Sequence, residues 1–204
     1  DAPKPWATVR PNGLHVFNGA ISKATRDKLW AFFHPKTKHG AREGVGPTCA
    51  PGDGEFPWYQ RFKRFPKTAH YNGWHSGKYI GPDAQREFAA TYPELHAAVM
   101  EAAQSVADAG EDMSDVPAWG RFVPESVAVM RHEPNWGLGA HFDNAQDVDE
   151  GMVLMLSISD HDAVPRAFKF TDAPRGREFS VATRDSQAVV FGGECYDEWM
   201  HQSV

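Results

Sequence analysis

The sequence predicts an α+β fold that is mainly β, with helices in the first half of the chain and short strands in the second. Segments with helical spacing of apolar residues lie before residue 110. Short apolar or alternating runs, separated by turns rich in glycine and proline, dominate from residue 126 onward. Strands in close succession indicate a sandwich or a barrel, and the preceding helices are expected to pack on one face of it.

The composition is that of an ordinary globular domain, with 41% hydrophobic and 24% charged residues among 204. The formal net charge of -6 argues against broad, nonspecific binding of nucleic acid, which requires a positive field. Cys49 and Cys195 form no Cys-x-x-Cys pair, so neither a zinc cluster nor a disulfide framework is expected. The sequence has no apolar run of about 18 residues and no signal peptide, so we expect an intracellular protein without a membrane span.

Three elements are predicted in the first half of the chain. Gly13 to Phe17 alternates loosely and is expected to form a short strand. Ser22 is placed to cap a helix from Lys23 to Phe33. Pro82 to Ala109 is predicted as one helix with an apolar stripe, ended by Gly110.

Between these helices, about residues 36–81, periodicity fails and glycine, proline, aromatic and basic residues are frequent. A segment this long without regular structure is often a lid or a binding loop. Aromatic rings stack on bases and cations contact phosphates, so the mixture suits a flipped nucleotide; a basic loop anchored to the core by aromatic residues is the alternative. The residues predicted to contact the substrate are Trp58, Tyr59, Arg61, Lys63, Arg64, Tyr71 and Trp74.

Strands are predicted throughout the second half. The nearly continuous apolar run Met152–Ser159 predicts a central strand. Pro174-Arg175-Gly176 predicts the turn of a hairpin. The other predicted strands are Ser126–His132, Ala167–Phe170, Glu178–Val181, Gln187–Phe191 and Met200–Gln202, with Leu138–Asp143 extended.

The strongest chemical signal is His141-Phe142-Asp143 together with His201. A strand alternates sides with a period of two, so His141 and Asp143 share one face. Two imidazoles and one carboxylate form the facial triad of non-haem iron enzymes, which leaves open positions for a cosubstrate and O₂. The alternative is a surface ion pair between His141 and Asp143, with His201 frayed at the end of the chain.

From Ser126 onward the chain resembles the AlkB family of Fe(II)- and 2-oxoglutarate-dependent dioxygenases. The signals occur in the family's order and end in the distal His201. A hydrophobic run that closes in Gly-Gly-Glu shortly before that histidine is the most specific of them. The other matching segments are Leu138–Asp143, Val153–Ser159, Phe168–Phe170 and Ala188–Glu194.

This resemblance implies a single dioxygenase domain over residues 1–204, with a double-stranded β-helix (jelly roll) over about 126–204 and supporting N-terminal helices. It implies that His141, Asp143 and His201 hold Fe(II) and that 2-oxoglutarate and O₂ are cosubstrates. The strand carrying Met130 and His132 is expected to face the cosubstrate. Two arginines follow the distal histidine in the family, and neither is present in this sequence. Either the chain continues past its last residue or the cosubstrate is held differently.

The implied activity is oxidative demethylation or hydroxylation of an alkylated nucleic-acid base, with residues 36–81 as the recognition lid. The sequence leaves open a protein or small-molecule hydroxylase or demethylase that uses the same iron chemistry. It also leaves open a jelly-roll binding module without catalysis.

Overall fold

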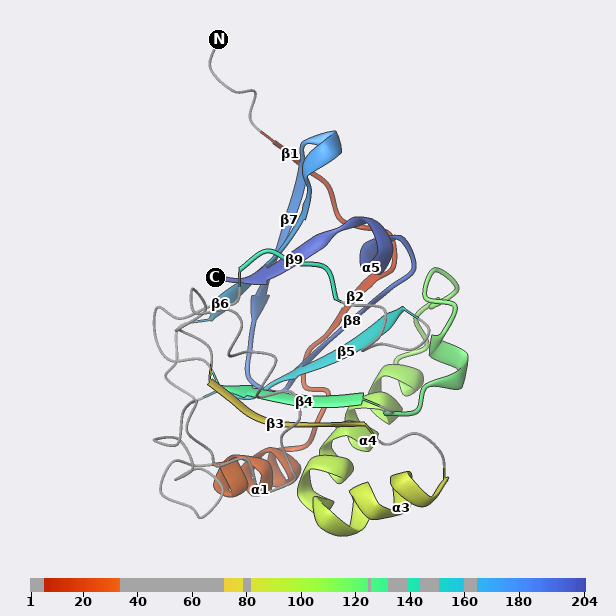
Figure 1. Cartoon of the computed structure of the whole chain (residues 1–204), viewed down its shortest axis with the longest axis vertical. Coiled ribbons are helices and arrows are strands. Elements are labelled where there is room, and N and C mark those ends of the chain that lie inside the picture. Colours follow the sequence, from red (N-terminus) through yellow and green to blue (C-terminus); the bar gives the residue numbers. More distant parts are fainter. Residues whose placement is uncertain are drawn as a thin grey trace. The chain divides into compact units, whose positions relative to one another are not determined.

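The computed structural model describes residues 6–33, 72–78, 82–124, 126–131, 139–143, 151–159 and 165–204. Among these residues the fold is α+β and mainly β, as the sequence predicts (Figure 1). The elements in chain order are β1 (Ala7–Thr8), β2 (Leu14–Phe17), α1 (Lys23–Phe33), β3 (Asn72–Lys78), α3 (Pro82–Thr91), α4 (Pro93–Asp108), η3 (Trp119–Arg121), β4 (Ser126–Arg131), β5 (Met152–Ser157), β6 (Arg166–Asp172), η4 (Ala173–Arg175), β7 (Arg177–Thr183), β8 (Gln187–Gly192), α5 (Glu194–Glu198) and β9 (Met200–Ser203).

The chain divides into two compact units. The first consists of Asp1–Ile21, Ala102–Phe122 and Gly139–Val204, and the second of Ser22–Glu101 and Val123–Leu138. The boundary therefore falls inside α4. All three candidate metal ligands belong to the first unit.

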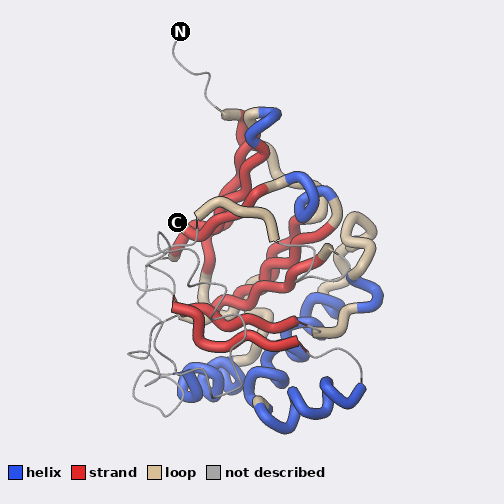
Figure 2. The backbone as a smooth tube through the Cα atoms, viewed as in Figure 1, coloured by secondary structure: helices blue, strands red, loops and turns tan. Residues whose placement is uncertain are grey.

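The first unit contains two sheets. One has the strand order β1-β7-β6-β9, and the other has the order β2-β8-β5, with the strands labelled in Figure 1 and drawn in red in Figure 2. The described strands do not close into a barrel. Side chains from both sheets meet in one hydrophobic cluster, so the sheets share a core. Its buried members are Leu14, Phe168, Phe170, Val181, Val189, Phe191, Cys195, Tyr196 and Trp199.

The sheet formed by β2, β8 and β5 is covered on both faces. Val189 and Phe191 of β8 point into the cluster shared by the sheets, whereas Ala188 and Val190 pack with the C-terminal part of α4. This explains the continuous apolar sequence of β8, because a strand covered on both faces shows no alternation. The continuous apolar sequence of β5 has the same cause, because its alternate side chains pack against the two hydrophobic clusters. Among the described residues, however, β5 lies at the edge of its sheet and not at the centre as predicted.

The helix predicted over Pro82–Ala109 is two helices. α3 ends at Thr91 and α4 begins at Pro93, with Tyr92 between them. Proline disfavours the helical conformation in the residue that precedes it, and it fits the first position of a new helix. The predicted terminator, Gly110, has a positive φ of 66° just after α4.

In the second unit, α1 has the bounds that the sequence predicts, and Ser22 caps it. The Thr25 amide donates to the Ser22 hydroxyl oxygen over 3.3 Å, and the Ser22 amide donates to Glu101 over 2.5 Å. β3 pairs antiparallel with β4. The strand β3 falls within residues 36–81, where the sequence shows no periodicity.

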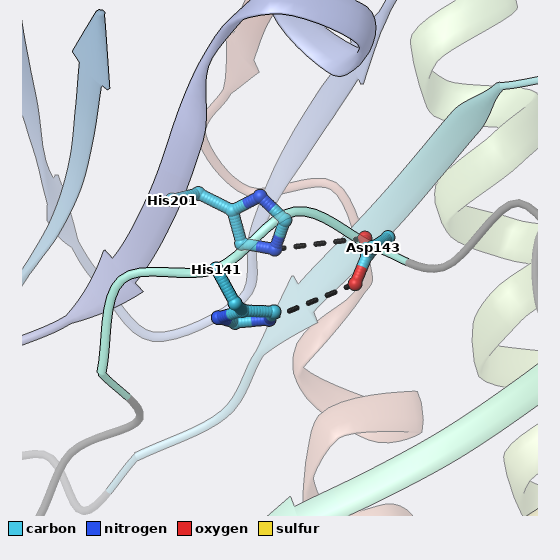
Figure 3. A group of neighbouring side chains, drawn as sticks. All are labelled: His141, Asp143 and His201. Atoms are coloured by element: carbon cyan, nitrogen blue, oxygen red, sulfur yellow. Dashed lines mark ion pairs between the residues drawn. The ribbon is translucent and has the colours of Figure 1, made fainter. Parts of the chain in front are cut away.

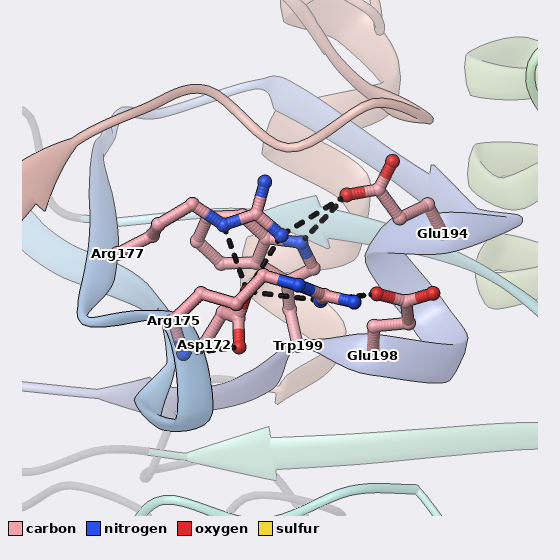
Figure 4. Close-up of polar contacts among 6 residues, drawn as sticks. All are labelled: Asp172, Arg175, Arg177, Glu194, Glu198 and Trp199. Atoms are coloured by element: carbon pink, nitrogen blue, oxygen red, sulfur yellow. Dashed lines mark hydrogen bonds and ion pairs between the residues drawn. The ribbon is translucent and has the colours of Figure 1, made fainter.

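The hairpin of β6 and β7 confirms the predicted turn and is organised by a buried carboxylate. Asp172 is 1% exposed and accepts hydrogen bonds from the Arg175 amide at 3.3 Å and from Arg177 Nε at 2.7 Å (Figure 4). Burial acts to raise the pKa of Asp172, but the two arginines outweigh burial and lower it. The carboxylate therefore stays ionised and holds the turn.

The same arginines fasten the hairpin to α5. The Arg177 guanidinium lies 4.8 Å from the ring centre of Trp199 and 3.4 Å from Glu194. Arg175 pairs with Glu198 at 2.5 Å. Trp199 is fully buried and directly precedes β9, so these contacts fix the start of the strand that carries His201.

Among the described helices, none combines the length and the apolar character that crossing a bilayer requires.

Gly13, at the start of β2, is a point of close backbone approach. Its φ is 83°, and an added Cβ would lie 2.2 Å from the Gly192 carbonyl oxygen. Gly19 has a similar φ of 67° but has open space around it. Alanine substitutions at Gly13 and Gly19 therefore separate the energetic cost of the positive φ from the cost of crowding by the Gly192 carbonyl.

We expect Gly13→Ala to lower the free energy of unfolding by about 2–5 kcal/mol, because strain from positive φ and crowding both act. Gly19→Ala should cost about 1–2 kcal/mol from the positive φ alone. Urea unfolding followed by tryptophan fluorescence measures both. Equal losses in the two variants would show that the Gly13–Gly192 approach carries no cost.

Candidate metal centre

The pairing of β9 brings the two histidines together. β9 pairs antiparallel with β6, which places His201 opposite Phe170. On its other side it forms a bridge in which His141 and His201 exchange both backbone hydrogen bonds, at 3.1 and 2.9 Å. Directly opposed residues project to the same face of a sheet. The two imidazole ring centres accordingly lie 4.3 Å apart.

Asp143, two residues after His141, completes the cluster. One carboxylate oxygen lies 3.7 Å from His141 Nε2 and the other lies 3.5 Å from His201 Nε2 (Figure 3). One donor atom from each residue lies within 4.8 Å of the others. An ion with bonds of about 2.0–2.2 Å separates neighbouring ligands by about 3–4 Å. The two distances from the histidines to Asp143 fall in this range, so the grouping is compatible with a single shared ion.

Aromatic residues surround His201. The ring centres of Phe168 and Phe191 lie 5.5 and 5.0 Å from its own, and these two residues come from different sheets. His201 is 5% exposed, whereas the side chains of His141 and Asp143 are 31% and 26% exposed. The cluster thus has an apolar wall on one side and is accessible on the other.

The electrostatics favour the protonation states that metal binding requires. Burial and the neighbouring His201 lower the pKa of His141 below 6.5, so its imidazole is neutral at pH 7. Burial acts to raise the pKa of Asp143, but the contact with His201 and the charge of His141 outweigh it and lower the pKa. Metal ligands must be deprotonated, and these two groups are deprotonated at neutral pH.

A backbone contact fixes the His141 tautomer. Its Nδ1 lies 2.7 Å from the Gly139 carbonyl oxygen, which can only accept a hydrogen bond. The proton therefore sits on Nδ1, and the Nε2 lone pair faces Asp143. A hydrogen bond of this kind behind the ligating nitrogen orients most metal-binding histidines.

The structure brings His141, Asp143 and His201 together, while their role as metal ligands stays a prediction. His201 is buried within β9, so the alternative in which it is a frayed terminal residue is wrong. The other candidates remain predictions. Met130 lies in β4 and Trp74 in β3, but their side chains are not described. The candidates outside the described residues are Trp58, Tyr59, Arg61, Lys63, Arg64, Tyr71 and His132.

The sequence interpretation missed the wall of phenylalanine rings. Phe168 and Phe170 alternate along β6, opposite Ser203 and His201 of β9. The period-two pattern of Phe-Lys-Phe is a visible signal that both rings share a face. The sequence does not show that this face is the one that meets His201.

Comparison of the chain with models of protein families and with curated proteins gives no match. The interpretation therefore depends on geometry and donor chemistry. Two imidazoles and one carboxylate on one side of an ion suit a divalent transition metal and leave coordination positions free. Such an arrangement can support redox chemistry with O₂ or can activate water.

We expect Co(II) to bind with a visible absorption band and Asp143→Ala to weaken this binding by about 100-fold or more. Loss of groups that only support a metal ligand already costs about 10–100-fold. Phe142→Ala is the matched control, because Phe142 lies between two ligands but is 51% exposed. Unchanged affinity in Asp143→Ala would remove this carboxylate from the site.

The metal-free protein should titrate at His141 with a midpoint below pH 6.5, as measured by imidazole NMR, with the neutral form protonated at Nδ1. The unfolded chain then binds this proton at a higher pH than the folded protein does. The free energy of unfolding therefore falls as the pH drops through 6.5. His141→Gln should remove that part of the slope; a midpoint above 6.5 would contradict the assigned environment.

Proposed function

We propose that the protein is a non-haem Fe(II)- and 2-oxoglutarate-dependent dioxygenase whose iron is held by His141, Asp143 and His201. The observation that carries the proposal is the convergence of these three donors from two separate segments of the chain. The partial burial of the cluster supports an ion-binding site. Exposed acidic groups commonly lie close together without binding an ion, whereas His201 of this cluster is buried.

The proposed fold of this unit is a double-stranded β-helix. Its support is the path of the chain, which alternates between the two sheets. The chain passes from β5 to the hairpin of β6 and β7 in the other sheet, returns through β8, and ends in β9 beside β6. Strands that switch sheets in this way are typical of jelly rolls. In this architecture the ligands lie on the inner face, where His201 contacts Phe168 and Phe191.

When bound, Fe(II) supplies the chemistry by which one atom of O₂ enters a substrate C–H bond while the other enters succinate, formed from 2-oxoglutarate with release of CO₂. The protein's own residues provide order and exclusion of water. Gly139 holds the His141 ring by its Nδ1 proton. Phe168 and Phe191 keep water from His201. The half-exposed His141 and Asp143 leave the approach from the other side open.

The proposed substrate is nucleic acid with an alkylated base. Support comes from the sequence of residues 36–81, where aromatic and basic residues alternate in the manner of a base-stacking and phosphate-binding surface. Hydroxylation of an N-methyl group gives a product that loses formaldehyde. Demethylation is therefore the expected outcome on a methylated base.

The test is a mass-spectrometric product assay with Fe(II), 2-oxoglutarate and a panel of methylated nucleosides, oligonucleotides and peptides. We expect succinate, formaldehyde and a demethylated oligonucleotide, and none of them with Asp143→Ala. Phe142→Ala should retain activity. Turnover on peptides alone would replace the nucleic-acid assignment, whereas metal binding without any turnover would favour a non-catalytic module.

A further inference from the structure

The alternating pattern of β9 does not by itself determine which of its residues lies beside Asp143. A slip of one residue exchanges the two faces of a strand, but a slip of two residues restores them. His201 and Ser203 share a face, opposite Phe170 and Phe168 of β6. A slip of two residues would move His201 by roughly 7 Å along the strand. Asp143 would then be out of reach, since its carboxylate now lies 3.5 Å from His201 Nε2.

An anchor at the start of β9 removes this ambiguity. Trp199 directly precedes β9 in an extended conformation, is fully buried, and belongs to the cluster shared by the two sheets. It lies two residues before His201, so the two side chains project to the same face of the extended chain. The position of the Trp199 ring in the core therefore sets the position of His201.

Two polar contacts hold the Trp199 ring in place (Figure 4). The Arg177 guanidinium lies 4.8 Å from the ring centre, and the indole Nε1 donates to Glu194 Oε1 over 3.4 Å. The same oxygen accepts a hydrogen bond from Arg177 Nη2 at 3.4 Å. One face and one edge of the ring are thus held by two side chains that also bind each other. We call Arg177, Glu194 and Trp199 the indole clamp.

The clamp adds direction to the packing of the ring. Apolar burial is non-directional, so it favours a buried Trp199 without choosing between neighbouring positions along the sheet. A cation over the ring face and a hydrogen bond at its edge each require one position. Arg177 is itself fixed, because its Nε and Nη2 atoms lie 2.7 and 2.5 Å from Asp172, which is 1% exposed. The clamp therefore ties β9 to the hairpin of β6 and β7.

We propose that Arg177 is a positioning residue of the metal centre, which sets the metal affinity by fixing the register of β9 through Trp199. The inference rests on the proposed function, since it takes His201 as a metal ligand. The side-chain partners of Arg177 among the described residues are Asp172, Glu194 and Trp199, none of which is a candidate ligand. Arg177 thus acts on the ion only through the strand.

Lys169 provides a matched control on the same sheet. It lies in β6 directly opposite Gln202 of β9, and it pairs with Glu178 of β7 at 2.5 Å. Its side chain is 29% exposed, close to the 24% of Arg177. Lys169→Met therefore removes a comparable ion pair, but one that does not include Trp199.

Co(II) titration followed by visible absorption tests the role of the clamp. Arg177→Met keeps an apolar side chain but loses the charge and the hydrogen bonds. It should weaken Co(II) binding by about 10–100-fold, the range found for groups that orient metal ligands. Arg177→Lys should recover part of the loss, because lysine keeps a cation near the ring without the planar fork. Lys169→Met should bind Co(II) as the wild-type protein does.

Amide hydrogen exchange of the metal-free protein reports the register itself, because His141 and His201 each donate their backbone amide to the other. In Arg177→Met these two amides should exchange about 10-fold faster or more, through local opening of β9. The amides that pair β8 with β5 should keep their wild-type protection, which distinguishes a loss of register from a general loss of stability. If Arg177→Met does not fold, Glu194→Gln is the milder variant, since its amide oxygen still accepts from the indole but carries no charge for Arg177.

Wild-type Co(II) affinity and wild-type exchange in a folded Arg177→Met overturn the inference and leave the proposed function standing. Equal losses in Arg177→Met and Lys169→Met do the same. Co(II) binding that depends on Arg177 in a chain without turnover supports the inference and overturns the dioxygenase assignment. A wild-type chain that binds no Co(II) overturns both.

Discussion

The candidate site depends on one structural constraint, the insertion of β9 between β6 and the segment that carries His141. Antiparallel pairing on both sides sets the position of His201 to within one residue. A slip by a single residue would turn His201 to the opposite face of the sheet. It would then lie outside the phenylalanine wall and away from Asp143. The register of β9 is therefore the link between the packed core and the chemistry.

Two groups of contacts hold this register from opposite ends of β9. At the start, Trp199 is fully buried beneath the Arg177 guanidinium, which also contacts the buried Asp172. At the end, Val204 and Ala167 exchange backbone hydrogen bonds of 2.9 and 3.3 Å. The charged side chains of Asp172, Arg175 and Arg177 lie at the hairpin turn and not at the candidate metal ligands. They can therefore fix the start of β9 without competing for an ion. This separation lets Asp143 act as the only carboxylate among the described residues of the site.

The sequence predicts those features that follow from local periodicity. The strands around the triad, the cap at Ser22 and the common face of His141 and Asp143 all depend on residues close in sequence. Features that depend on contacts between residues far apart in the sequence are harder to predict from it. The apolar run at Met152 predicts a central strand, but β5 is partly buried on both faces and lies at the edge of its sheet. Apolar character does not specify how many neighbouring strands a strand has. The short helix α5 contains too few residues for a periodic signal.

The partial prediction of the site has the same cause. Period two places His141 and Asp143 together, but nothing local indicates that Phe191, from the other sheet, packs against His201. Likewise, the alternation of β6 places Arg166 in line with Phe168, but only the folded structure shows that its buried Nη1 atom has no hydrogen-bond partner among the described residues. Sequence patterns specify the direction of a side chain. Whether a polar group is satisfied depends on contacts from the whole fold.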